Sequence, residues 1–325
     1  MVSSRLVFFV SAIFILTAQA VARPDFLYNF CELEKGNYTS NSTYQANLND
    51  LLFSLSSNTE IDHGFYHSSH GQNSDRVYGI GLCRGDINVN VCRGCLNNAA
   101  SLLTERCPNQ KEAIGWYDEC MLRYSNRSLL GVMETFPSFY MWNPSNVSVY
   151  YVNQFNQVLR TLLESLRSEA VAGGPDLKFA AGNATAPMFQ TLYALVQCTP
   201  DLSELDCNNC LAGAFQNIPL CCDGKQGGRV IRPSCNIRFE IYQFYNPTTA
   251  ASPRSRRPTN TDNKREASMV LSISMGVYLS VKRLRNNDGA TNESTRIELE
   301  SLQVDRGSES NKLGQGGYSA IYKYA

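Results

Sequence analysis

A cysteine pattern that occurs twice constrains this sequence most strongly. Five cysteines recur at one constant spacing, the first moving from position 83 to 198 and the last from 120 to 235. The five pairs are Cys83 and Cys198, Cys92 and Cys207, Cys95 and Cys210, Cys107 and Cys222, and Cys120 and Cys235. Such agreement indicates an internal duplication. The sequence therefore predicts two copies of one domain, at residues 24–135 and 136–246.

Residues around the cysteines repeat as well. CMLRYS from Cys120 matches CNIRFE from Cys235. Upstream, LLFSLS from Leu51 matches LLESLR from Leu162, a spacing of 111 rather than 115 positions. The difference must be absorbed in loops between the two motifs.

Hydrophobic periodicity predicts the fold class. Each copy opens with leucines at helical spacing, and a second helix carries the CxxC pair. Alternating apolar residues before and after that pair predict strands. The helical positions are Leu48, Leu51, Leu52 and Leu55 in the first copy, and Phe155, Leu159, Leu162, Leu163 and Leu166 in the second. We expect an α+β fold, with two helices on an antiparallel sheet in each domain and a mostly disordered tail.

The N-terminus predicts the compartment. Residues 1–22 have the features of a signal peptide: Arg5, an apolar run from Leu6 to Leu16, and small residues for cleavage. Entry into the secretory pathway allows disulfides to form. Sequons for N-glycosylation agree with that route and lie at Asn37, Asn41, Asn126, Asn146 and Asn183.

Composition and motifs exclude several function classes. The chain has 29 basic and 29 acidic residues, so it lacks the basic surface of a nucleic-acid binder. The two CxxC pairs are more than a hundred residues apart and repeat within separate domains, which argues against a zinc site. His63, His67 and His70 are expected in a solvated loop. We predict structural disulfides, no catalytic residue, no metal and no cofactor.

The C-terminal region differs in composition. Residues 247–266 are rich in Pro, Thr, Ser, Asn and Arg and predict a disordered linker. Residues 267–281 form an apolar segment followed by KRLR. As a helix the segment would be about 22 Å long, against about 30 Å of bilayer core. A type I anchor that weakly attaches the chain and a defective remnant both stay open.

The cysteine motifs resemble a known plant family. C-x8-C-x2-C occurs twice, followed by CPNQKEAIGWYDECMLRYS and by CCDGKQGGRVIRPSCNIRFEIYQFY. This combination resembles a tandem ginkbilobin-type (stress-antifungal, cysteine-rich repeat) domain. The resemblance implies disulfides joining Cys31 to Cys107, Cys83 to Cys92, Cys95 to Cys120, Cys198 to Cys207, and Cys210 to Cys235. Whether Cys221 and Cys222 pair with each other stays open.

The resemblance also implies a candidate sugar site. The ginkgo seed member is similar to a mannose lectin whose site uses an Asn after the first cysteine, an Arg six residues before the last and a Glu five after it. The first domain has Glu32, Ile114 and Ser125 there, so the site is absent. The second has Arg229 and Glu240, but the Asn has no counterpart there. The alternative is an ion pair between Arg229 and Glu240 across adjacent strands at the surface.

The final segment resembles the start of a kinase domain. NKLGQGGYSAIYKYA places Gly314, Gly316 and Gly317 in a loop similar to the ATP loop of cysteine-rich receptor-like kinases. Ser319 replaces the third glycine, and neither an HRD nor a DFG segment follows. Residues 282–325 are therefore interpreted as a juxtamembrane segment with a truncated, vestigial kinase start.

These observations predict a non-catalytic extracellular binding or sensing module in plant defence or stress signalling. The expected partner is a glycan, with mannose as one candidate, or another cell-surface protein. The expected location is the apoplast, or the plasma membrane if residues 267–281 insert. The alternatives are a secreted mannose-binding antifungal lectin and an incomplete gene model of a membrane serine/threonine receptor kinase.

Overall fold

The computed structural model describes residues 23–57, 64–174, 177–247 and 319–321. The predictions for the signal peptide, the apolar segment 267–281 and the three tail glycines lie outside these residues. So do nearly all of the linker at 247–266 and of residues 282–325.

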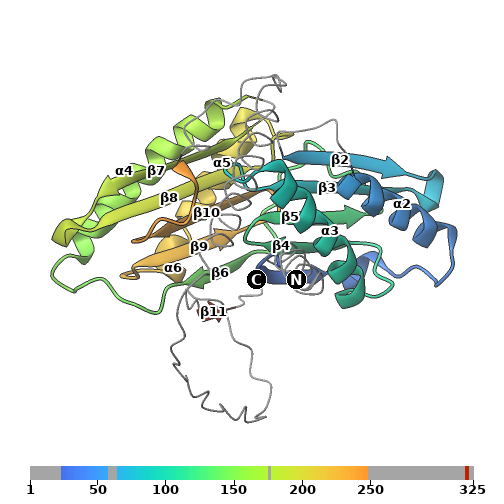
Figure 1. The fold of residues 1–325 in the computed structure, drawn as a ribbon, viewed down its shortest axis with the longest axis horizontal. Helices are drawn as coiled ribbons and strands as arrows, with labels where there is room; N and C mark the ends of the chain where they lie inside the picture. Colours follow the sequence, from blue (N-terminus) through green and yellow to red (C-terminus); the bar gives the residue numbers. More distant parts are fainter. Residues whose placement is uncertain (1–22, 58–63, 175–176, 248–318, 322–325) are drawn as a thin grey trace, which may run out of the picture. The chain divides into compact units, whose positions relative to one another are not determined.

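The first domain is a five-stranded antiparallel sheet with two helices (Figure 1). Its strands are ordered β1-β4-β5-β3-β2. The elements are β1 (Phe26–Cys31), η1 (Leu33–Lys35), α2 (Thr43–Ser57), β2 (Phe65–His70), η2 (Asn73–Asp75), β3 (Val77–Cys83), α3 (Val89–Arg106), β4 (Ala113–Tyr117) and β5 (Cys120–Ser125).

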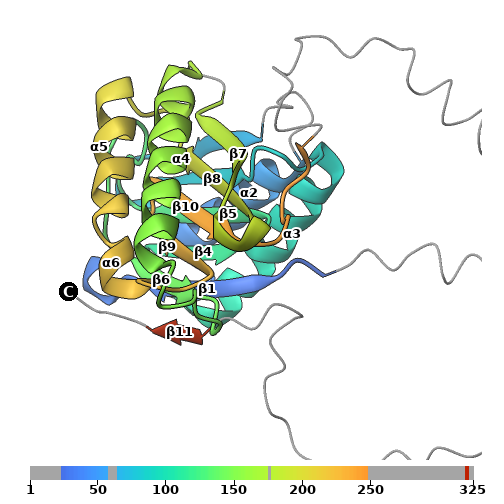
Figure 2. The ribbon, with the colours of Figure 1, turned by 90° about the vertical axis from the view of Figure 1, so that its left-hand side faces the viewer.

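The second domain repeats this order of strands and helices. Its sheet is ordered β11-β6-β9-β10-β8-β7, and α4 and α5 lie side by side on one face of it (Figure 2). The predicted α+β class is confirmed in both domains. The elements are β6 (Phe139–Trp142), α4 (Val152–Ala172), β7 (Phe179–Thr185), η3 (Pro187–Phe189), β8 (Thr191–Cys198), α5 (Glu204–Phe215), α6 (Ile218–Cys221), β9 (Gly227–Ile231), β10 (Cys235–Glu240) and β11 (Ser319–Ile321).

Helical spacing determines which face of the opening helices is buried. In α2 the four predicted leucines are all buried, and in α4 the buried face comprises Phe155, Leu159, Leu163, Leu166 and Ala170. Residues three or four apart share a helix face, so each helix covers its sheet along one apolar stripe. Side-chain caps fix where the CxxC helices begin: Asn88 accepts hydrogen bonds from the amides of Asn90 and Val91, and Ser203 accepts one from Asp206.

The sheet faces without helices pack against each other. One hydrophobic cluster combines residues of the first sheet with residues of the second, including Leu82 and Trp116 with Phe139, Met141 and Ile231. Strands β4, β5 and β9 are consequently buried at every position. The two domains therefore share a core in addition to their own, and this third core positions the charged groups described below.

The C-terminal strand β11 extends the second sheet. It pairs antiparallel with β6, with Ser319 opposite Trp142 and Ile321 opposite Tyr140. The sequence analysis assigns no strand to this part of the tail. None of the helices within the described ranges has the length and apolar content needed to cross a membrane.

Candidate functional site

Charged side chains of both domains meet where the domains join. We call this group the interdomain ion cluster; it consists of Arg84, Asp118, Arg229, Arg238 and Glu240. Asp118 occupies the two-residue turn between β4 and β5 of the first domain. Its carboxylate lies 2.9 Å from Arg84 Nη1, 2.5 Å from Arg229 Nη1 and 3.1 Å from Arg238 Nη1. Arg229 and Arg238 lie opposite each other on β9 and β10, so both guanidinium groups reach the same carboxylate.

Electrostatics keeps Asp118 ionised. Burial by itself would raise the pKa of its carboxyl group, but the positive charges of Arg229, Arg238 and Arg84 lower that pKa well below its usual range. Arg84 is fixed in turn by Asp86, with contacts of 2.6 and 3.0 Å. Through the ionised Asp118 carboxylate, the cluster links the first domain to the second.

The structure places both predicted sugar-site residues in this cluster. Arg229 is 6% exposed and Glu240 is 0% exposed, with Glu240 Oε1 3.7 Å from Arg238 Nε. The alternative prediction of an ion pair between them at the surface is wrong, because both side chains are buried. The cavity beside Arg229 is about 50 Å³, which holds water but not a sugar ring. A soluble sugar cannot reach Arg229 while the domains are packed together.

Strand register reveals a counterpart for the Asn that the sequence comparison missed. The amide of Glu32 donates to the carbonyl of Glu112 at 3.0 Å, and the amide of Asn143 donates to that of Gly227 at 2.9 Å. Because these two contacts are equivalent in the two sheets, Asn143 occupies the position of Glu32. Its Nδ2 lies 3.4 Å from Glu240 Oε2.

The missed position had a detectable signal in the sequence. In the family pattern the Asn follows the first cysteine, and the second domain has no cysteine at that place. It has Trp142 where the first domain has Cys31, because Trp142 lies opposite Gly228 as Cys31 lies opposite Ala113. The spacing of 111 positions between the two leucine motifs also relates Glu32 to Asn143. Applying that spacing to β6 would have found the residue.

A second charged group, the domain-1 ion cluster, lies at the corresponding place on the first sheet. Glu112 Oε1 lies 2.5 Å from Arg123 Nη2 and 2.9 Å from Arg127 Nη2, and Ser125 donates to Oε2 at 2.7 Å. Glu134, between the domains, also contacts Arg123, and its Oε1 lies 2.6 Å from Arg127. Burial by itself would raise the pKa of Glu112. Hydrogen bonds from Arg127 and Ser125 and the charge of Arg123 lower that pKa by more than burial raises it, so the net shift is downward.

The buried carboxylate comes from different segments in the two domains. Glu112, directly before β4, corresponds to Gly227 at the start of β9, and Ser125 on β5 corresponds to Glu240 on β10. A Cβ added at Gly227 would lie 1.9 Å from Glu240 Oε2. A side chain at position 227 would therefore displace the Glu240 carboxylate, and the small Ser125 likewise leaves room for Glu112.

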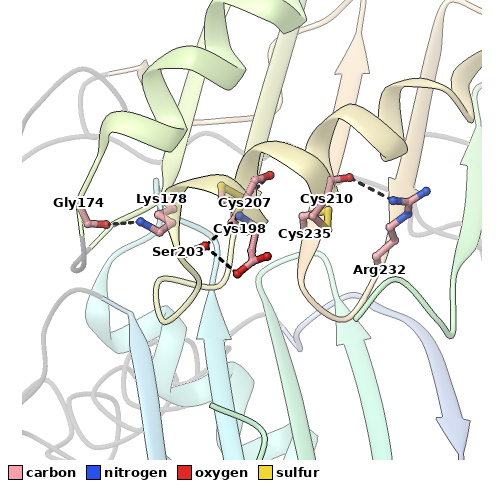
Figure 3. The surroundings of a disulfide bond; sticks show 9 residues. Gly174, Lys178, Cys198, Ser203, Cys207, Cys210, Arg232 and Cys235 are labelled. Atoms are coloured by element: carbon pink, nitrogen blue, oxygen red, sulfur yellow. Dashed lines mark hydrogen bonds between the residues drawn. A yellow bond between two sulfur atoms is a disulfide. The ribbon is translucent and has the colours of Figure 1, made fainter. Parts of the chain in front are cut away.

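All twelve cysteines form disulfides. The structure joins the five pairs that the resemblance implies and, in addition, joins the neighbours Cys221 and Cys222. Figure 3 shows α5 held to β8 by Cys198–Cys207 and to β10 by Cys210–Cys235, with Arg232 Nη1 donating to the carbonyl of Cys210 at 3.1 Å. These groups cross-link the fold.

The remaining predicted residues lie apart from the two clusters. The five sequon asparagines, Asn37, Asn41, Asn126, Asn146 and Asn183, are all exposed, which leaves them sterically open to glycosylation. His67 and His70 lie on strand β2 and not in the expected loop, while His63 is outside the described residues. Among the residues that the structure describes, no three His, Cys, Asp or Glu side chains are grouped to hold a metal ion.

A family model and individual relatives all match the two cysteine-rich domains of this chain. The salt stress response/antifungal family matches residues 30–127 and 144–242. The chain is 37% identical over 351 residues to cysteine-rich receptor-like protein kinase 25 of Arabidopsis thaliana, covering 96% of this chain and 52% of that protein. It is 42% identical over 244 residues to an antimicrobial ginkbilobin-2-like protein of Castanea crenata, covering 75% of this chain and 99% of that protein.

A solved structure has the same fold. The tandem DUF26 ectodomain of the Arabidopsis thaliana cysteine-rich receptor-like protein PDLP8 superposes with a TM-score of 0.54 at 24% identity, covering 66% of this chain and 98% of that one. The chain spans about half the length of the receptor-like kinase that it matches. The family match lies within the two disulfide-bonded domains.

Proposed function

This chain belongs to the salt stress response/antifungal family, and from that premise we propose that it is a non-catalytic extracellular binding module acting in plant defence or stress signalling. Support comes from the names of its relatives, which include receptor-like kinases, an ectodomain and an antimicrobial protein. The signal peptide and sequons predicted from the sequence agree with an extracellular site.

The observation that carries the non-catalytic part of the proposal is the state of the buried charges. General acid and base catalysis needs a group whose pKa lies near the working pH. Asp118 and Glu112 are instead held ionised by arginines, and each has a lowered pKa. These carboxylates stabilise the fold and are poorly suited to move protons.

We infer that the ligand is a glycan. The ginkbilobin-type resemblance and the Castanea crenata relative support this class. Mannose binding by the second domain is a second candidate, because Asn143 Nδ2 lies 3.4 Å from Glu240 Oε2 and Arg229 is two residues along β9 from the position opposite Glu240. That site would require the domains to separate, since Asp118 of the first domain already contacts the Arg229 guanidinium.

A binding screen tests the proposal. The intact secreted chain is immobilised and presented with a panel of neutral and acidic plant and fungal oligosaccharides, and a reduced and alkylated sample is the control. Saturable binding of an oligosaccharide that disappears on reduction is expected. Equal capture by native and reduced chains, or capture of no oligosaccharide at all, would contradict glycan recognition.

Location and anchoring need a separate experiment. We propose that the chain reaches the apoplast. Expression of the full sequence in plant cells, followed by fractionation of apoplastic fluid and membranes, measures how it partitions. Recovery in apoplastic fluid supports secretion, whereas retention in carbonate-washed membranes would show that residues 267–281 anchor the chain.

A further inference from the structure

A pocket of about 710 Å³ lies where strand β2 of the first domain faces the second domain, and its lining contains no residue of either ion cluster. Its walls come from β2, from the segment between the domains, from the residues that join α4 to β7, and from the start of α5. They include Phe65, His67, Leu130, Lys178, Asp201 and Glu204. The volume lies within the range of about 300 to 1,000 Å³ that small-molecule sites occupy.

We propose that this pocket binds an extended segment of a partner protein in which an apolar side chain stands next to a basic one. This goes beyond the glycan binding proposed above, because it concerns a different class of ligand. Four features of the pocket support such a ligand: a buried ammonium group, an adjacent sheet edge, apolar walls and an excess of negative charge.

The ammonium group belongs to Lys178, and the fold uses only part of its donor capacity. The residue is 3% exposed, and its Nζ donates to the carbonyl of Gly174 at 3.0 Å (Figure 3). An ammonium group has three N–H donors, and this one has no acidic partner among the described residues. A buried charge without a counter-charge is costly. A carbonyl oxygen of a bound peptide would accept a further hydrogen bond from Nζ.

The sheet edge adjoining the pocket is formed by β2. This strand is the last in the first sheet, and β3 is its strand partner within the described part of the chain. The other edge of such a strand carries backbone N–H and C=O groups with which an extended peptide can pair. Because Phe65 and His67 of β2 also line the pocket, a peptide lying along this strand can place a side chain in it.

Apolar side chains form part of the wall. Phe65 and Leu202 are buried, with 7% and 3% of each residue exposed, whereas Leu130 is 43% exposed. A partly exposed leucine beside two buried apolar residues provides a surface that an apolar side chain of the ligand would remove from water.

The charge of the lining specifies the neighbouring side chain of the ligand. Lys178 stands against Asp201 and Glu204, so with a neutral His67 the pocket has an excess of one negative charge. Asp201 Oδ2 accepts a hydrogen bond from the amide of Gly131 at 2.7 Å, and Glu204 is exposed. A Lys or Arg of the ligand can pair with Glu204, whereas an acidic peptide would be repelled.

A peptide array probed with the full secreted chain tests the inference. The probes are N-acetylated, C-amidated pentapeptides whose central residues vary, and mannopentaose is the competitor. We expect the captured peptides to share an apolar residue next to Lys or Arg, and mannopentaose to leave their capture unchanged. Fluorescence anisotropy then measures the affinity of the strongest peptide.

Lys178→Met separates binding from folding. It should weaken the binding of that peptide about tenfold, because a hydrogen bond from a charged donor is lost. It should not lower the melting temperature, because it removes a buried charge without a counter-charge at nearly constant volume. A variant that is less stable and binds as wild type does would show that Lys178 serves the fold alone.

The matched pair of charge variants is Glu204→Gln and Glu169→Gln, because Glu169 is an exposed glutamate of α4 outside the pocket. Glu204→Gln should weaken binding of a basic peptide about two- to fivefold, and Glu169→Gln should leave it unchanged. Selection of acidic peptides, capture of no peptide, or equal binding by wild type, Lys178→Met and Glu204→Gln would overturn the inference while leaving the glycan proposal intact. Displacement of the peptides by mannopentaose would also overturn it, because the pocket would then be a glycan site.

Discussion

The two domains share one topology but differ in the disulfides that cross-link it. In the first, the disulfide Cys31–Cys107 joins β1 to the end of α3 across a separation of 76 residues. In the second, Trp142 takes the place of Cys31, and Cys222 pairs with its neighbour Cys221. The second domain therefore lacks one long-range covalent closure, and its buried arginines depend on Asp118 from the first domain.

The two domains also differ in the position of the buried carboxylate. The first domain combines Glu112 with Ser125, and the second combines Gly227 with Glu240. The duplicated fold retains a buried carboxylate next to a central arginine, Arg123 or Arg238, while the position that supplies it has changed. Topology therefore tolerates exchange of individual groups so long as volume and charge remain matched.

The largest expected effect comes from breaking this exchange. Gly227→Glu would place a second carboxylate against Glu240, so we expect the free energy of unfolding to fall by about 4 kcal/mol or more. Gly227→Glu combined with Glu240→Ser transplants the first-domain arrangement and should recover at least half of the loss. Denaturant unfolding measures both variants. A double variant no more stable than the single one would refute the exchange.

Removing the disulfides compares the two closures directly. Replacing Cys31 and Cys107 by serine opens a long loop and should lower the free energy of unfolding by about 4 kcal/mol. Replacing Cys221 and Cys222 by serine opens almost no loop and should cost about 1 kcal/mol. Thermal melts under non-reducing conditions give the difference. Equal losses from both pairs would show that loop closure does not distinguish the domains.

Neutralising Asp118 tests the dependence of the second domain on the first. Asp118→Asn leaves Arg84, Arg229 and Arg238 without their shared negative charge, and we expect a loss of about 3 kcal/mol. Asp50→Asn, at an exposed position of α2, is the control and should change stability by less than about 0.5 kcal/mol. Hydrogen exchange should show increased opening in β9 and β10. Unchanged protection in these strands would mean that the cluster does not hold the second domain.

The smallest effect is the pH dependence of the same group. The pKa of Asp118 is lowered in the folded chain, so its contribution is fully present above the ordinary aspartate pKa of about 3.9 and is lost as pH falls below that value. Between pH 5 and pH 3 it should cost about 1 kcal/mol of unfolding free energy. Chemical denaturation at the two pH values measures the change. A variant with Asp118→Asn should show a shallower dependence, and an identical slope would argue against Asp118 as the titrating group.

Features that depend on local spacing can be identified from the amino-acid sequence alone. Leucines at helical intervals identify α2 and α4 because side chains three and four residues apart share a helix face. The constant spacing of five cysteines identifies the duplication, since insertions within either copy would have changed it. Both signals lie within short segments and need no knowledge of what those segments contact.

The side chains that contact the helix-free face of the second sheet depend on how the two domains pack together. Arg229 and Glu240 have the sequence pattern of an exposed sugar site, yet both are buried: Arg229 contacts Asp118 of the first domain, and Glu240 contacts Arg238 and Asn143. Asn143 joins them through strand register, and Gly227 makes room for Glu240. These contacts join residues on or next to different strands. The hydrophobic periodicity of one strand does not indicate which residues of other strands pack against it.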